Sequence, residues 1–257
     1  GAIYLTGNNN TINNNQLKNN IANKYAGSLM IKGENNTITQ NTITQNTANQ
    51  HGGAIHITGN KNTITNNHFE NNNATGDGGA IYITGTQNNL THNTANYGGA
   101  ISITGTQYTI TNNNITQNHA TGYAGAIKTG TQSNNGKITN NNIENNIADL
   151  RGGAAFLQGN ELEILNNTFI NNHATSQIGG ALYILGDSII IDNNVIDKSY
   201  SKGNGGAINL EGANSQITNN NITNSISESN GGVAFIRGDG VTITNNNFTN
   251  NTATEYT

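Results

Sequence analysis

The sequence predicts an all-β fold, a right-handed single-stranded parallel β-helix (a β-solenoid) that forms one continuous domain over residues 1–257. Two observations predict it: a repeated phrase, GGAIxIxG, and apolar residues that fall into columns when its copies are aligned. The second glycine of successive copies is spaced by 26, 26, 26, 20, 26, 28, 27, 26 and 26 residues. A fixed period of this size is typical of a solenoid, in which each repeat packs only on its neighbours. We therefore expect about ten coils of ~26 residues, with three short strands in each.

The coil that begins at Gly53 shows how one repeat is built. Residues 54–58 alternate apolar and polar side chains, which is the period of a half-buried strand. Residues 62–65 and 68–70 form two further short strands, each with one inward apolar side chain, and Asn-rich bends separate them. No stretch carries the 3.6-residue apolar period of a helix.

The apolar columns set the register of the coils. We expect the second strands to stack Ile12, Ile38, Ile64, Ile110, Ile138, Ile164, Ile191, Ile217 and Ile243. The coil that begins at Gly79 is six residues short, and we expect it to bypass the second strand, so that Leu90 joins the column of third strands and Asn93 the bend after it.

Two further columns are predicted to be structural. Glycines before the first strand allow tight turns and close approach of the backbone, and they include Gly53, Gly79, Gly99, Gly153, Gly180, Gly206 and Gly232. Asparagines at the bend after the second strand tolerate a left-handed backbone and can bond to each other as a ladder; they are Asn66, Asn112, Asn140, Asn166, Asn193, Asn219 and Asn245.

Composition excludes several classes of function. The net charge of −4 and the pI near 5.8 argue against a nucleic-acid partner, which calls for a basic stripe. Cysteine is absent, so disulfides and thiolate metal sites are excluded. No apolar run is long enough to span a membrane, and neither a metal site nor a cofactor is expected.

The Asn- and Thr-rich repeats resemble those of the adhesin-like surface proteins of methanogenic archaea. The phrase Gly52-Gly53-Ala54-Ile55, followed by Phe69-Glu70-Asn71-Asn72, is also similar to the repeat of chlamydial polymorphic outer-membrane proteins. The resemblance covers the whole chain. It implies a β-helix, an extracellular location at the cell surface and an adhesive or cell-envelope role.

Outward positions of the first strand offer a candidate binding face. Several of them are aromatic or histidine, and exposed rings of this kind suit carbohydrate or protein partners. The candidate ligand-binding residues are Tyr4, His56, Tyr82, Phe156, Tyr183 and Phe235. The acidic residues are scattered, and the bend that carries Glu161 and Asp187 has no expected Lys or Arg partner. We therefore expect no catalytic residue and no enzyme.

The sequence thus favours an adhesin-like or stalk segment, which binds a cell-surface glycan or protein weakly through many copies of a contact. A first alternative is a structural filament or sheath subunit that assembles with copies of itself end to end. A second is a carbohydrate-active β-helix enzyme. Because neither end shows a capping element, we expect the chain to be an excerpt of a longer repeat protein.

Overall fold

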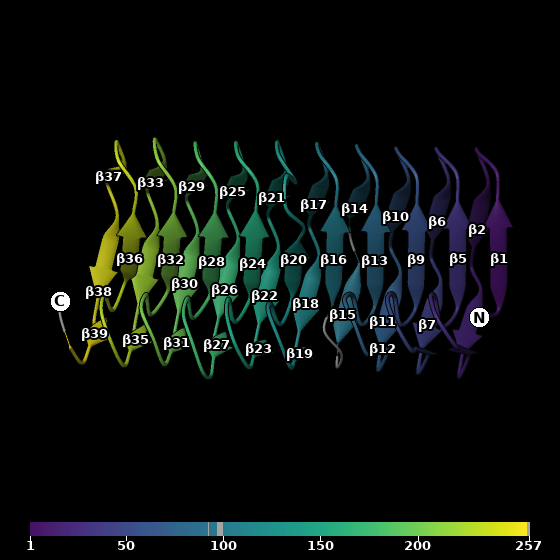
Figure 1. Cartoon of the computed structure of the whole chain (residues 1–257), viewed down its shortest axis with the longest axis horizontal. Coiled ribbons are helices and arrows are strands. Elements are labelled where there is room, and N and C mark those ends of the chain that lie inside the picture. The colour runs from purple at the N-terminus through teal and green to yellow at the C-terminus, as the bar shows by residue number, and fades with distance from the viewer. Residues whose placement is uncertain (92, 97–99, 256–257) are drawn as a thin grey trace.

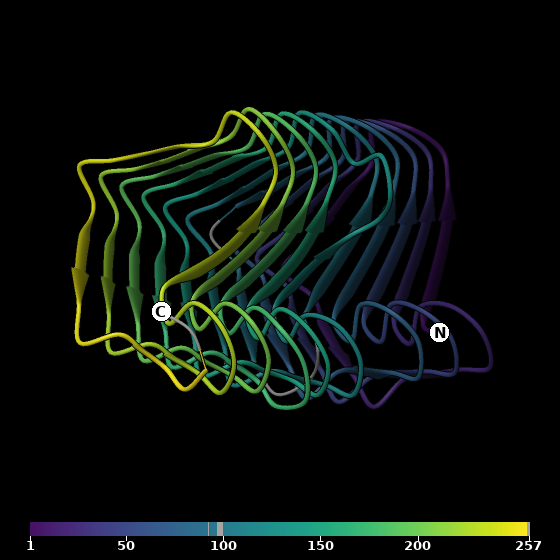
Figure 2. The ribbon, with the colours of Figure 1, turned by 60° about the vertical axis from the view of Figure 1, so that its left-hand side comes forward.

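The chain winds into an elongated parallel β-helix whose coils lie side by side along one axis (Figure 1). The computed structural model describes residues 1–91, 93–96 and 100–255. These residues form strands, turns and bends, with no helix among them. Viewed closer to the axis, successive coils repeat one outline, and the loops that lead into the first strand stack along one edge (Figure 2).

The first sheet contains the first strand of every coil, ten parallel strands in chain order. Apolar side chains alternate along each strand, as the sequence predicts. The strands are β1 (Ile3–Thr6), β5 (Leu29–Lys32), β9 (Ile55–Thr58), β13 (Ile81–Thr84), β16 (Ile101–Thr104), β20 (Ile127–Thr129), β24 (Ala155–Gln158), β28 (Leu182–Leu185), β32 (Ile208–Glu211) and β36 (Ala234–Arg237).

The second and third sheets each contain ten parallel strands of three residues. The second consists of β2 (Thr11–Asn13), β6 (Thr37–Thr39), β10 (Thr63–Thr65), β14 (Asn89–Thr91), β17 (Thr109–Thr111), β21 (Lys137–Thr139), β25 (Glu163–Leu165), β29 (Ile190–Asp192), β33 (Gln216–Thr218) and β37 (Thr242–Thr244). The third consists of β3 (Gln16–Lys18), β7 (Thr42–Thr44), β11 (His68–Glu70), β15 (Thr94–Asn96), β18 (Asn114–Thr116), β22 (Asn142–Glu144), β26 (Thr168–Ile170), β30 (Val195–Asp197), β34 (Asn221–Thr223) and β38 (Asn247–Thr249).

A fourth, two-residue strand follows the third strand, so the expectation of three strands in each coil is wrong. Two residues are too few to show an alternating pattern, which is why the sequence does not reveal this strand. These strands form one sheet of β4 (Ile21–Ala22), β8 (Thr47–Ala48) and β12 (Asn73–Ala74), and a second of β19 (His119–Ala120), β23 (Ile147–Ala148), β27 (His173–Ala174), β31 (Tyr200–Ser201), β35 (Ile226–Ser227) and β39 (Thr252–Ala253).

The core is a continuous stack of like residues, which confirms the predicted register. Ile64 pairs with Ile38 on the preceding coil, and both side chains are fully buried. The same stacking holds for Ile55 with Leu29 in the first sheet and Phe69 with Ile43 in the third. Each large buried apolar side chain contributes about 1.5–3 kcal/mol, so stability accumulates as coils are added.

The glycine column is required by the close approach of neighbouring coils. A Cβ atom on Gly53 would lie 2.0 Å from the backbone oxygen of Gly79 and 2.5 Å from that of Asn73. Gly52, which precedes it, has a φ of +68°, a left-handed conformation that favours glycine. Gly99, also predicted as structural, lies outside the described residues.

The predicted asparagine column does adopt the left-handed conformation, with φ between 53° and 58° from Asn66 to Asn245. The ladder, however, is built mainly by the residue that follows. Asn67, for example, donates its side-chain amide to Oδ1 of Asn93 at 3.1 Å, and both residues are buried. This second-corner ladder continues through Asn15, Asn41, Asn67, Asn93, Asn113, Asn141, Asn167, Asn194, Asn220 and Asn246.

Two more ladders occupy other corners. The first-corner ladder, before the second strand, contains Asn10, Asn36, Asn62 and Asn88. The third-corner ladder, after the third strand, includes Asn20, Asn46 and Asn72 and, further on, Asn118, Asn146 and Asn172. Buried amides of this kind satisfy each other and the backbone, which removes the desolvation penalty of unpaired polar groups.

The short coil omits a different element from the one expected. Leu90 pairs with Ile64 and Ile110 in the second sheet, and Asn93 belongs to the second-corner ladder. Strand β15 takes the place of the third strand. Among the described residues of this coil there is no fourth strand. Omitting the second strand would sacrifice a buried Leu and an Asn rung, whereas the fourth strand buries only a small side chain.

Candidate functional site

The outer face of the first sheet is covered by loops rather than open to solvent. Each loop ends two residues before the glycine that begins the next coil, and the residues at this position, here called the cover column, include Tyr25, His51, Asp77, Tyr123 and Arg151. They pack over outward residues of the first sheet. The expectation of an exposed aromatic face is therefore wrong at the positions where this cover is complete.

The candidate ligand-binding residues differ widely in exposure. His56, Phe156 and Tyr183 are at most 6% exposed, so they cannot stack on a ligand without movement of the cover. Tyr82 and Phe235 are half-buried, and Tyr4 is 64% exposed. The cover column was not predicted from the sequence, although its regular position two residues before the glycine that begins each coil was a usable signal.

One aromatic cluster lies over the N-terminal coils, and we call it the histidine cluster: Tyr25, His51, His56 and Tyr82. The rings of His51 and Tyr82 stack with centroids 4.6 Å apart, and Tyr25 meets His56 edge-on at 4.9 Å. Burial, together with the nearby His51 and Lys32, lowers the pKa of His56 to about 4. Burial and the carboxylate of Asp77 raise the pKa of Tyr82. Tyr25 remains 44% exposed.

A second cluster, the arginine cluster, covers later coils: Tyr123, Arg151, Phe156 and Tyr183. Phe156 and Tyr183 stack with centroids 5.1 Å apart, and Tyr123 lies 5.1 Å from Phe156. The Arg151 guanidinium lies 5.8 Å from the Tyr123 ring and 5.4 Å from the Tyr183 ring, within range of a cation–π interaction. Tyr123 is 37% exposed, so one ring of this cluster also faces solvent.

A notch of about 250 Å³ separates the two clusters. Among the described residues, its lining includes residues 73–78 of the third coil, Gly79, Ala100 and Ile101, and residues 119–124 of the fifth coil. Lys128 crosses beside it and pairs with Asp77 at 2.6 Å. The notch lies at the coil that is six residues shorter than its neighbours.

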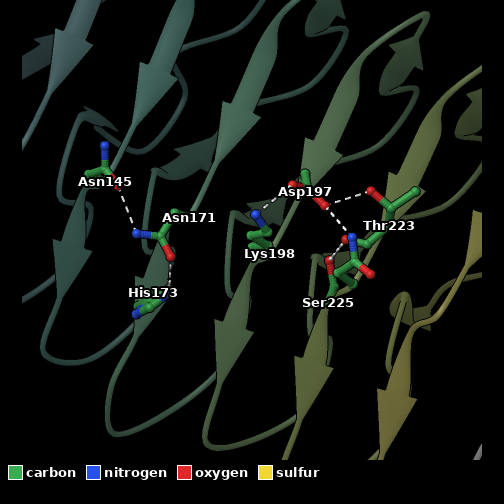
Figure 3. A network of polar contacts seen from close by, with 8 residues as sticks. Asn145, Asn171, His173, Asp197, Lys198, Thr223 and Ser225 are labelled. Atoms are coloured by element: carbon green, nitrogen blue, oxygen red, sulfur yellow. Dashed lines mark hydrogen bonds and ion pairs between the residues drawn. The ribbon is translucent and has the colours of Figure 1, made fainter.

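Other outward faces use their polar groups to join neighbouring coils. Figure 3 shows such a network, in which the Asn171 amide donates to Asn145 at 2.7 Å and His173 contacts Asn171 at 3.0 Å. One coil further on, Thr223 donates to Asp197 at 2.7 Å. Although partial burial opposes it, hydrogen bonds from Thr223 and Asn224 hold the pKa of Asp197 below its usual range. These groups stabilise the stack and leave fewer free contacts for a ligand.

Beside the acidic bend, Lys137 of strand β21 pairs with Glu163 of strand β25 at 2.9 Å, and both line a shallow hollow together with Glu161 and Ser188. Among the described residues, neither Glu161 nor Asp187 at the bend itself forms an ion pair with Lys or Arg. Arg237 and Glu211, on neighbouring strands of the first sheet, form a further ion pair at 3.6 Å. Among the described residues, no group of three His, Asp or Glu side chains is arranged to hold a metal ion.

The comparison with protein families identifies the class. Residues 1–169 match the family model described as the right-handed β-helix region, and the chain belongs to that family. The parallel sheets and the matched region together establish the right-handed β-helix predicted from the sequence. Among curated proteins, none matches the chain. The part of the chain that the structure describes also contains no helix long and apolar enough to cross a membrane.

Proposed function

We propose that the chain is a rigid segment of an extracellular, adhesin-like surface protein that displays aromatic side chains to a cell-surface glycan or protein. The observation that carries the proposal is the cover column, which presents Tyr25 and Tyr123 on one face while stacked neighbours hold both rings in place. A ring that is already fixed loses little conformational entropy on binding. The resemblance of the repeats supports the adhesive role.

The geometry favours many weak contacts over one deep site. The two exposed rings belong to separate clusters on either side of the notch, and a rigid rod fixes the distance between them. Linked contacts of this kind raise the overall affinity without a tight individual site. The rod itself supplies reach, because each coil adds ~4.8 Å to its length.

A glycan array with the purified chain tests the proposal. We expect binding to a subset of glycans, and we expect Tyr25→Ala and Tyr123→Ala each to weaken it, with a larger loss in the double variant. Val195→Ala is the matched control, because Val195 is also 39% exposed but lies on the third sheet. Equal binding by the double variant and the control would contradict this placement.

A further inference from the structure

Arg151 is a cation without a carboxylate partner on the outer face of the first sheet. Two carboxylates of this region already have partners. Asp149, two residues earlier in the chain, contacts His119 at 2.7 Å, and Glu211 pairs with Arg237 at 3.6 Å. Among the described residues, Arg151 takes part in no ion pair. Its positive charge is therefore not balanced by the protein.

Neutral groups hold the Arg151 guanidinium in place. Its Nε donates to Oε1 of Gln177, and its Nη1 donates to the hydroxyl oxygen of Tyr183 at 3.5 Å. The Tyr183 hydroxyl donates its own proton to Glu211 at 3.2 Å, so its oxygen can accept from Arg151. The rings of Tyr123 and Tyr183 lie 5.8 and 5.4 Å from the guanidinium. The group is thus fixed without being neutralised, and it loses little conformational freedom on binding.

The guanidinium keeps donors for a ligand. Of its five N–H donors, Gln177 and Tyr183 use two. Within the described part of the chain, at least one donor on each of Nη1 and Nη2 bonds to no group. Two parallel donors of this kind match the oxygens of a carboxylate or sulfate. Arg151 is also half-buried, so water screens its attraction for an anion less than at a fully exposed site.

The exposed ring of Tyr123 lies beside this cation. Tyr123 is 37% exposed, and its ring is 5.8 Å from the Arg151 guanidinium and 5.9 Å from Nζ of Lys128. The charge of Lys128 is balanced by Asp77 at 2.6 Å, whereas that of Arg151 is not. In the described residues, no Lys or Arg makes such a contact with Tyr25, the exposed ring of the histidine cluster. A sugar that contacts Tyr123 is therefore the one within reach of an unbalanced cation.

We propose that the arginine cluster recognises an anionic glycan, in which a carboxylate or sulfate group binds the Arg151 guanidinium while its sugar contacts the Tyr123 ring. The inference rests on the proposed glycan binding and names the class of sugar. Hydrogen bonds between two charged groups are stronger than neutral ones. Because the whole chain carries a net charge of −4, it does not attract anions in general, and the preference depends on this local site.

Calorimetric titration of the intact chain with matched oligosaccharides tests the proposal. The probes are an oligomer of a uronic acid, its carboxyl-reduced neutral counterpart and a sulfated derivative of that neutral oligomer. We expect at least one acidic probe to bind about tenfold more tightly than the neutral one, and the preference to shrink in high salt. Which acidic probe binds more tightly identifies the anion.

Gln177→Glu is the most informative variant, because it supplies Arg151 with a carboxylate and keeps the acceptor for Nε and every aromatic ring. We expect it to abolish the preference for acidic probes. Arg151→Lys keeps the charge but loses the planar fork, so it should reduce the preference. Lys18→Gln is the matched control, since it changes the net charge by the same amount as Gln177→Glu at an exposed position of the third sheet. Circular dichroism establishes that each variant keeps the β-helix.

The outcomes separate this inference from the proposed function. Equal binding of acidic and neutral probes, or an unchanged preference in Gln177→Glu, would overturn the inference, while weaker binding by Tyr123→Ala would still support glycan binding. Absence of binding to any glycan would overturn both. Binding of polyglutamate, but of neither acidic oligosaccharide, would overturn the inference in favour of an acidic protein partner.

Discussion

The corner before the second strand is built in two ways on the two sides of the short coil. In the first four coils it holds the first-corner ladder, in which Asn62 accepts from the backbone and side-chain amides of Asn36 at 3.0 and 3.1 Å. In coils five to nine the same position holds Tyr108, Gly136, Leu162, Ile189 and Ser215, and the three large apolar side chains among them are buried. One backbone path thus accepts either a polar ladder or an apolar filling.

The two arrangements satisfy the corner by different interactions. A buried Asn donates to the Asn of the next coil or, as Asn88 does at the end of the ladder, to a backbone carbonyl of the preceding coil, whereas a buried Leu needs neighbours that fill its surroundings. At the junction, the Tyr108 ring occupies the space left by Gly136, where a Cβ atom would lie 2.0 Å from Cζ of the ring. The large and small residues of adjacent coils are therefore matched.

A cavity in the apolar part of this corner should lower the free energy of unfolding the most. Leu162→Ala should lower the free energy of unfolding by about 3 kcal/mol, because it removes a fully buried side chain from a close-packed corner. Chemical denaturation measures the loss. Leu165→Ala is the control, since Leu165 lies in the same coil but is half-buried on the outer face. If Leu162→Ala lowered the free energy of unfolding no more than Leu165→Ala, the surrounding side chains would have to collapse into the cavity.

Removing one Asn from the first-corner ladder should lower the free energy of unfolding by somewhat less than the Leu162→Ala cavity does. Asn62→Ala leaves the buried amides of Asn36 without their acceptor, and we expect a loss of about 2 kcal/mol. The first rung gives the comparison, because Asn10 only donates into the ladder from a partly exposed position, and Asn10→Ala should cost about 1 kcal/mol or less. Equal losses of stability in Asn62→Ala and Asn10→Ala would show that accepting the buried amides of Asn36 contributes nothing further.

The two aromatic clusters should differ in how their stability depends on pH, because the histidine cluster contains His51 and His56 whereas the arginine cluster contains no histidine. The folded-state pKa of His56 is about 4, below the ordinary 6.5, so the unfolded state binds more protons between these values. Stability should therefore fall as the pH drops from 6.5 towards 4, by about 1 kcal/mol at pH 5 after allowance for solvent screening.

Denaturation at several pH values, compared with His56→Gln, isolates this dependence from that of the carboxylates. The variant should be less sensitive to pH in this window. An unchanged pH dependence would show that His56 is free to protonate in the folded chain.

Loss of the ion pair between Lys128 and Asp77 should change the free energy of unfolding the least. The pair of Lys128 and Asp77 is partly exposed, so Asp77→Asn should cost about 0.5–1 kcal/mol and the cost should shrink in high salt. The more exposed pair of Arg237 and Glu211 provides the control, and Arg237→Gln should have almost no effect. Thermal denaturation at two salt concentrations distinguishes the two pairs.

Much of the fold followed from local patterns. The 26-residue period and the alternation around Ile55 and Ile64 predicted the coils, their register and the inward columns, because residues in register must contact their own counterparts. The left-handed conformation of Asn66 followed from its place after a strand. The fourth strand was missed because two residues carry no periodicity.

The site was less predictable. Alternation correctly placed Phe156 and Tyr183 on the outer side of the first sheet, but it could not show that a loop from another coil covers them. Whether Tyr25 or Tyr183 is exposed depends on contacts between residues far apart in the chain, which no local pattern encodes.

The 26-residue repeat is enough to predict a right-handed β-helix, since a repeat can bury its apolar residues only by stacking on its copies. The repeat does not show which asparagines are buried, which aromatic rings reach solvent, or that Leu90 of the short coil joins the second sheet. These outcomes depend on hydrogen bonds and packing between coils. The short coil keeps Leu90 in the second sheet and Asn93 in the second-corner ladder, because both are buried against the neighbouring coils.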